Sequence, residues 1–303
     1  MMEGTLEQQD SGTPLDPEQV EPEKVERPWI GTARMFYANK AAVFGLIGLS
    51  LVILFGVFGP ILFQSDPFDI VGKPLMPPGD LHLLGTDYLG RDVMNGIIYG
   101  ARPTMFIAIT ATLFSTIIGI SVGAAAGFYG GIVDNILMRF TEFFQVLPAL
   151  VFAMVIVAVF SSSYILVIIA IGITTWQALA RLTRAEFLKI KEREFVTAAR
   201  AVGAGNLRLI SRIILPNALP PLIISITLNI GTTIIFEAAL SFLGLTDPDV
   251  MTWGKMIGLS RDYFFEAWWT VTIPGLAIFF TVLCIALIGD GLNDAFNPKL
   301  RGR

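Results

Sequence analysis

Long uncharged, apolar runs alternate with shorter polar segments along this chain. The uncharged runs cover residues 41–63, 103–133, 143–180, 213–236 and 267–289. A helix as long as the first run would measure about 34 Å at about 1.5 Å per residue, enough to cross a hydrocarbon core of about 30 Å. The 38 residues from Phe143 to Ala180 are enough for two crossings, with a turn at Ser161–Ser163. The pattern therefore predicts an all-α membrane protein with six transmembrane helices.

The polar connections predict where some of these helices begin. Residues 64–102 are rich in proline and glycine, which is typical of an exposed loop. The second span is expected to begin near Pro103, because proline is favoured in the first turn of a helix. From Ser115 to Gly127 one serine and three glycines recur every four residues, a spacing that lets another helix approach closely. That contact can lie within one subunit or between subunits, and both alternatives stay open.

Composition narrows the class of protein. The chain of 303 residues is 54% hydrophobic and only 15% charged, whereas a typical soluble domain is about 25% charged. One cysteine, Cys284, and one histidine, His82, leave no intrachain disulfide and no Cys/His metal site. The sequence has no HExxH, no Ser/His catalytic set and no glycine-rich phosphate loop ending in Gly-Lys-Ser/Thr. We therefore expect a non-catalytic chain that binds neither a metal nor ATP.

The distribution of basic residues predicts the orientation in the membrane. Sixteen of the 21 Lys and Arg residues fall in the two tails and in the loops on the same side of six spans. Basic loops face the cytoplasm, so both termini and the segment 181–217 are predicted to be cytoplasmic. The chain then divides into a disordered acidic tail (1–28), an interfacial segment with the first span and the start of the external loop (29–81), and a five-helix core (82–303).

The segment 181–217 has the features of a docking device. It carries eight of the 21 basic residues and contains a small-residue patch, Thr197–Ala199, within a helical pattern. Gly203 ends that pattern, and a second short amphipathic helix, 206–214, is expected to stop at Pro216. Two short helices at an angle would make a knob that another protein can grip. The alternative is a solvated basic loop without a partner.

Glu237 is the one carboxylate well inside a predicted span. An ionisable group at that depth costs about 2.5–3.5 kcal/mol on insertion scales, so its side chain is expected to face the bundle or a watery cavity. One interpretation is that Glu237 lines a translocation pathway. The other is a hydrogen-bonded structural carboxylate near the outer interface.

The spacing of Ala198-Ala199, Gly203 and Ile213-Ile214-Leu215-Pro216 resembles the EAA loop of bacterial ABC importer permeases. In that family the loop holds the coupling helix, which sits in a groove of the ATPase subunit. Thr197 stands where the family usually has glutamate. The carboxylate that would make one polar contact to the ATPase is therefore missing here. The resemblance implies seven ATPase-coupling residues: Thr197, Ala198, Ala199, Gly203, Ile213, Leu215 and Pro216.

Further stretches resemble the dipeptide, oligopeptide and nickel branch of these permeases. They are residues 82–92, residues 240–245 followed by Trp253-Gly254, and residues 289–301, in which Asn293 replaces a usual basic residue. The interfacial segment and the first span are similar to the extra N-terminal region of the second, C-type, permease subunit.

The resemblance implies a fold and a set of partners. The fold would be a type I ABC importer core of the MetI-like kind, plus one N-terminal helix, in the plasma (inner) membrane of a prokaryote. The partners would be a sister permease, two ATPase subunits that carry ATP and Mg, and an extracellular binding protein, with no nucleic acid. The solutes would be di- or oligopeptides, with nickel or oligosaccharides as alternatives for the same machinery. The alternative of a different class is a secondary transporter that uses Glu237.

Overall fold

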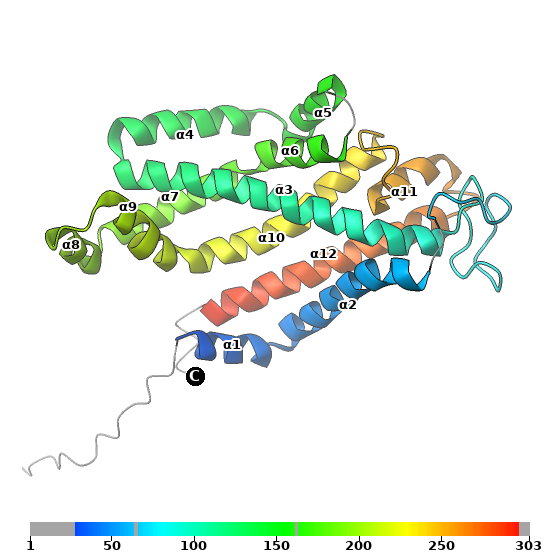
Figure 1. Cartoon of the computed structure of the whole chain (residues 1–303), viewed down its shortest axis with the longest axis horizontal. Helices are drawn as coiled ribbons and strands as arrows, with labels where there is room; N and C mark the ends of the chain where they lie inside the picture. The colour runs from blue at the N-terminus through cyan, green and yellow to red at the C-terminus, as the bar shows by residue number, and fades with distance from the viewer. Residues whose placement is uncertain (1–27, 64–65, 161–162, 297–303) are drawn as a thin grey trace, which may run out of the picture.

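The computed structural model describes residues 28–63, 66–160 and 163–296, and in these ranges the chain is helical apart from its loops and two isolated β-bridges (Figure 1). The predicted disordered tail, 1–28, lies outside the described residues except for Pro28, the first residue of helix α1. The helices that cross or flank the bundle are α1 (Pro28–Ala38), α2 (Lys40–Leu62), α3 (Val93–Tyr129), α4 (Gly131–Val146), α5 (Ala149–Phe160), α6 (Tyr164–Thr175), α7 (Gln177–Lys191), α10 (Leu215–Phe242) and α12 (Trp269–Phe296).

The six predicted spans are confirmed, but two of them are bent. Among the described residues four helical stretches are long and apolar enough to cross a membrane: α2, α3, residues 206–242 and α12. The pairs α4–α5 and α6–α7 each pass the same test when joined, and they bend by 83° and 45°. Leu147 and Pro148 separate α4 from α5, and proline disfavours a helical conformation in the residue before it.

The glycine stripe of α3 packs within this chain. A side chain at Gly123 would meet the Ala180 carbonyl oxygen at 2.2 Å, and one at Gly127 would meet Phe187 Cβ at 2.6 Å. Both contacts belong to α7, whose backbone lies against the stripe. The alternative of packing within one subunit is therefore confirmed.

Helix α3 begins ten residues earlier than the sequence predicts. The side chain of Asp92 accepts a hydrogen bond from the backbone N–H of Asn95 at 3.1 Å, which caps a helix starting at Val93. Pro103 lies inside this helix, so it does not mark the start of the span. The prediction was wrong because Arg102, although charged, is an exposed residue of a helix that extends past the apolar run.

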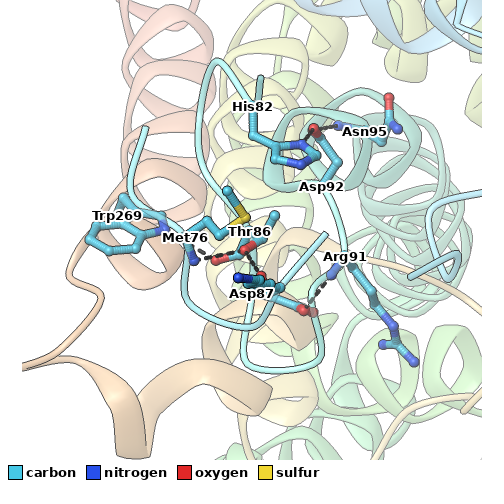
Figure 2. Close-up of polar contacts among 9 residues, drawn as sticks. Met76, His82, Thr86, Asp87, Arg91, Asp92, Asn95 and Trp269 are labelled. Carbon is cyan, nitrogen blue, oxygen red and sulfur yellow. Dashed lines mark hydrogen bonds and ion pairs between the residues drawn. The ribbon is translucent and has the colours of Figure 1, made fainter. Parts of the chain in front are cut away.

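Residues 66–92 form a folded cap at one end of the bundle (Figure 1, Figure 2). The fully buried Thr86 hydroxyl donates to the Lys73 carbonyl at 2.7 Å and accepts from the Met76 N–H at 2.9 Å. The indole N–H of Trp269 donates to the Thr86 carbonyl at 3.2 Å, which fastens the cap to α12. His82 Nδ1 lies 2.9 Å from Asp92 Oδ2, so the histidine supports the residue that caps α3.

A short helix, α11 (Trp253–Ser260), followed by the 3₁₀ turn η3 (Arg261–Tyr263), lies between α10 and α12. Gly254 allows its backbone to approach α10 closely, because a Cβ there would lie 2.5 Å from Ala238 Cα. The cap and α11 share one end of the bundle, while the segment that follows α7 lies at the other end (Figure 1).

Candidate coupling site and buried carboxylate

Within the segment 181–217, residues 192–214 form a hairpin that projects from the end of α7. After α7 ends at Lys191 the chain forms α8 (Glu194–Ala201), a turn, and α9 (Asn206–Arg208). The predicted first helix of the knob is therefore present. The expected second helix is not separate, because α9 passes through the π-helix η2 (Leu209–Ile214) directly into α10.

Pro216 does not stop this helix, which corrects the sequence-based expectation. Proline lacks a backbone N–H and its ring clashes with the carbonyl one turn earlier, which normally breaks a helix. Here Pro216 occupies the first turn of α10, immediately after the wider π-helical turn. Prolines are tolerated in the first turn, and a π-helix inserts extra backbone without ending the rod.

Helix α8 has one buried side chain, and most of its other side chains are exposed. Val196 is 1% exposed and packs with Leu209 and Ile214 of η2. By contrast, Phe195 is 47% exposed and Val202 is 90% exposed. The two are seven residues apart and so fall on the same side of the helix, and apolar side chains grouped on one exposed side are typical of an interaction surface.

The residues implied as coupling residues occupy two different environments. Thr197 and Ala198 are exposed on α8, and Ala199 is half-buried against the core beneath the helix. Ile213 and Leu215 also pack against this core, whereas Pro216 is exposed. The small-residue patch and the Ile-Leu pair are thus not one surface: the first faces outward and the second anchors the hairpin.

Gly203 determines how the hairpin turns. Its φ of +88° lies in the left-handed region that favours glycine, and its N–H donates to the Arg200 carbonyl at 3.0 Å. The next N–H, of Ala204, donates to the Ala199 carbonyl at 3.0 Å, which completes a helix C-cap. No atom of the described residues lies within 4 Å of a Cβ built on Gly203. Glycine is therefore needed at this position for its backbone conformation and not for lack of space.

Two outward-facing residues were missed by the sequence analysis. They are Phe195 of α8 and Leu207 of α9, the latter 79% exposed. The signal for both was present, because each is a large apolar residue next to charged or polar residues, Glu194 for Phe195 and Asn206 and Arg208 for Leu207.

Ionic contacts fix the base of the hairpin to the rest of the bundle. Arg184 of α7 forms a two-point pair with Asp134 of α4, with Nε–Oδ1 and Nη2–Oδ2 distances of 2.5 and 2.6 Å. The Lys191 ammonium donates to the carbonyls of Gly127 and Phe128 at 3.4 and 3.3 Å, at the end of α3. A cation there also complements the negative end of the α3 dipole. These contacts join α7, from which the hairpin projects, to α3 and α4.

Glu237 belongs to α10 and is fully buried, on the part of that helix that packs against α11. Its Oε1 accepts a hydrogen bond from Ser241 Oγ at 2.5 Å, and Ser241 Oγ lies 3.1 Å from Thr252 Oγ1. Thr252 in turn caps α11 by accepting from the Lys255 N–H at 3.2 Å. Glu237 Oε2 has no hydrogen-bond partner in the described part of the chain. Through Ser241 and Thr252, Glu237 is connected to the start of α11. The assignment of Glu237 to a translocation pathway stays a prediction.

Comparisons with known proteins agree with this architecture. Residues 118–302 match the family model described as "Binding-protein-dependent transport system inner membrane component", and residues 27–78 match the "N-terminal TM domain of oligopeptide transport permease C".

Two named relatives cover nearly the whole chain. The chain is 40% identical to the "Di/tripeptide transport system permease protein DppC" of Pseudomonas aeruginosa (strain UCBPP-PA14), over 94% of this chain and 96% of the relative. It is 34% identical to the "Dipeptide transport system permease protein DppC" of Bacillus subtilis (strain 168), over 93% of this chain and 90% of the relative.

Among solved structures, the fold is similar to a chain of the inward-facing MetNI methionine ABC transporter. The TM-score is 0.56 at 18% identity, over 68% of this chain and 98% of that chain. At this identity the likeness shows the fold alone, and it confirms the MetI-like core.

Proposed function

Because this chain belongs to the family of binding-protein-dependent transport system inner membrane components, we propose that it is the C-type permease subunit of an ATP-driven importer of di- and oligopeptides. It forms the pathway together with a sister permease, and two separate ATPase subunits supply the energy. The single observation that carries this function is α8, a short helix with exposed apolar side chains that is rigidly connected to the spans.

The hairpin acts as a lever in this proposal. ATP and Mg are held by the ATPase subunits, and closure of those subunits displaces α8. A core that runs from Val196 through Leu209 and Ile214 to Leu222 of α10 then passes the displacement to the spans. Tightly packed interiors transmit such shifts because they deform little.

The substrate class is inferred from the names of the relatives. An extracellular binding protein delivers the solute to the permease. The two named relatives are called di/tripeptide and dipeptide permeases. Nickel or oligosaccharides stay possible for the same machinery, since the binding protein selects the solute. The subunit lies in the inner membrane with both termini in the cytoplasm, in keeping with the excess of Lys and Arg on that side.

Reconstitution tests the proposal. The chain is expected to co-purify with a sister permease and two ATPase subunits, and the assembled complex in liposomes is expected to accumulate a labelled dipeptide only with ATP and the binding protein. A catalytically inactive ATPase is the matched control and should abolish uptake. Uphill uptake by the chain without an ATPase would overturn the proposal and favour a secondary transporter.

A further inference from the structure

Helix α2 changes its packing partner halfway along its length. A Cβ on Gly48 would lie 2.5 Å from Cys284 Sγ of α12, and one on Gly59 would lie 2.2 Å from Ile98 Cγ2 of α3. The first half of α2 therefore contacts α12 closely, and its last turns contact α3 (Figure 1). Where α2 crosses from one helix to the other, the three helices cannot all be in close contact.

A cavity of about 270 Å³ occupies this crossing point. Its walls include Val52 and Phe55 of α2, Ala101 of α3 and Ala277 of α12. Leu84 of the folded cap also lines it. The cavity is thus walled by the N-terminal helix and by the core, and it lies toward the end of the bundle that carries the cap.

The cavity lies at hydrocarbon depth. Val52 and Phe55 precede the end of α2 at Leu62 by ten and seven residues, which corresponds to about 15 and 10 Å at about 1.5 Å per residue. The hydrocarbon core of a bilayer is about 30 Å thick. Both side chains therefore lie within one leaflet, inside the apolar layer.

Water is a poor occupant of this cavity. A volume of 270 Å³ corresponds to about nine water molecules at about 30 Å³ each. Each such molecule needs two to four polar partners, but the lining side chains are apolar, and the indole N–H of Trp253 already donates to the Ile97 carbonyl at 2.9 Å. Apolar cavities of this size stay dry or bind apolar molecules.

We propose that this cavity binds one acyl chain of a membrane lipid, which fills the space between α2 and the core. An acyl chain fits the depth of the cavity and can enter it from the bilayer. Phe55 is 57% exposed and Phe280 is 36% exposed on the outer side of the bundle, where the surrounding medium is hydrocarbon. The chain enters sideways, past these two rings, and reaches Leu84 and Ile97 on the inner walls. It contributes part of the attachment of α2 to α3 and α12.

The test uses photoactivatable fatty acids incorporated into the lipids of cells that make the full-length chain with its natural partners. Leu84 of the cap and Ile97 of α3 both line the cavity and are half-buried, so an acyl chain inside the cavity contacts them. After illumination in intact membranes, mass spectrometry is expected to find acyl-chain crosslinks on both residues. The exposed Phe279, 63% exposed on α12, reports ordinary contact with lipid.

Two variants that fill the cavity from different walls sharpen the test. Ala277→Phe and Ala101→Leu are each expected to abolish the crosslinks on Leu84 and Ile97 while those on Phe279 persist. Leu276→Phe, which enlarges a 58% exposed residue beside Ala277, is the matched control and should keep them. The proposal is overturned if wild-type Leu84 and Ile97 carry no acyl crosslinks while Phe279 does, if both filling variants retain them, or if a neighbouring polypeptide is crosslinked there instead.

Discussion

At the scale of single residues, Gly203 and Gly205 look alike in the sequence but have different roles. Gly203 has a φ of +88°, whereas Gly205 has a φ of −71°, which any residue adopts. Neither would bring a Cβ within 4 Å of another atom of the described chain. Backbone conformation alone therefore separates them.

This difference predicts opposite results for two equivalent substitutions. Gly203→Ala is expected to destabilise the hairpin by about 1–2 kcal/mol, because alanine is strained in the left-handed region. Gly205→Ala should be tolerated. Rates of limited proteolysis within 192–210 measure the local stability, and equal rates for the two variants would contradict the role given to Gly203.

Lys255 is a half-buried residue whose positive charge is favoured by some neighbours and opposed by burial. Its ammonium donates to the carbonyls of Asp247 and Val250, each at 3.2 Å, and lies 5.1 Å from the centre of the Phe68 ring. Burial lowers the pKa of the Lys255 amine, and the nearby positive charge of Arg91 acts in the same direction. The lysine therefore binds a proton less tightly in the folded chain than in the unfolded chain.

The lowered pKa predicts a pH dependence with a definite sign. Below the unfolded pKa of about 10.4 the unfolded state binds more protons, so the free energy of unfolding should rise as the pH increases toward that value. Lys255→Met removes this contribution, while Lys73→Met, at an exposed lysine of the cap, retains it. Thermal unfolding of the purified chain at several pH values up to about 10 measures the difference. A wild-type curve parallel to that of Lys255→Met would refute it.

At the scale of elements, the pair between Asp134 and Arg184 joins α4 to α7 at the base of the hairpin. Their side chains are 14% and 34% exposed, so water screens them only in part. Asp134→Asn is expected to cost about 1.5–3 kcal/mol of stability, the range for hydrogen bonds to charged groups. Lys189→Ala removes a 3.6 Å pair with Glu186 in which the lysine is 63% exposed, and should cost less than about 0.5 kcal/mol. Chemical denaturation compares them, and similar losses would mean that the pair does not fasten the helices.

The exposed face of α8 predicts where the ATPase subunit binds. Val202→Asp is expected to weaken ATPase binding by at least about 2 kcal/mol, or roughly 30-fold, because an unpaired charge would be buried in the contact. Val202 is a better probe than Gly203, where any side chain strains the backbone, or Ala199, which packs on the core.

A matched control for this substitution exists at the other end of the molecule. Leu81 of the cap is 83% exposed, close to the 90% of Val202. Leu81→Asp should therefore leave ATPase binding unchanged. Co-purification with quantified ATPase stoichiometry measures both variants, and normal assembly of Val202→Asp would place the docking surface elsewhere.

Local features of the elements could be predicted from the sequence, and long-range ones could not. The spans and the hairpin follow from the length of apolar runs and from residues close in sequence, such as Ala198 and Gly203. The Asp134–Arg184 pair and the contact of Ser241 with Thr252 depend on how helices pack. The passage of helix through Pro216 was missed because a π-helical turn has no simple periodic signal.

At the scale of the whole molecule, the bundle has two ends of different construction. The folded cap and α11 make up one end, and the α8 hairpin makes up the other (Figure 1). The end with the hairpin carries most of the Lys and Arg residues of the chain. Hydrogen bonds through Thr86 and Trp269 hold the cap, whereas a hydrophobic core holds the hairpin. These two ends are expected on opposite sides of the membrane.

Cysteine labelling can test this orientation, because Cys284 is the only cysteine of the sequence and is fully buried. The wild-type chain therefore serves as the unlabelled control. With a membrane-impermeant maleimide, Leu81→Cys is expected to react in intact spheroplasts, since a side chain in the cap faces the external medium. Leu207→Cys, in the hairpin, should react only after permeabilisation, because an excess of Lys and Arg keeps that end in the cytoplasm. Labelling of Leu207→Cys in intact spheroplasts would reverse the topology and would separate the hairpin from any cytoplasmic ATPase.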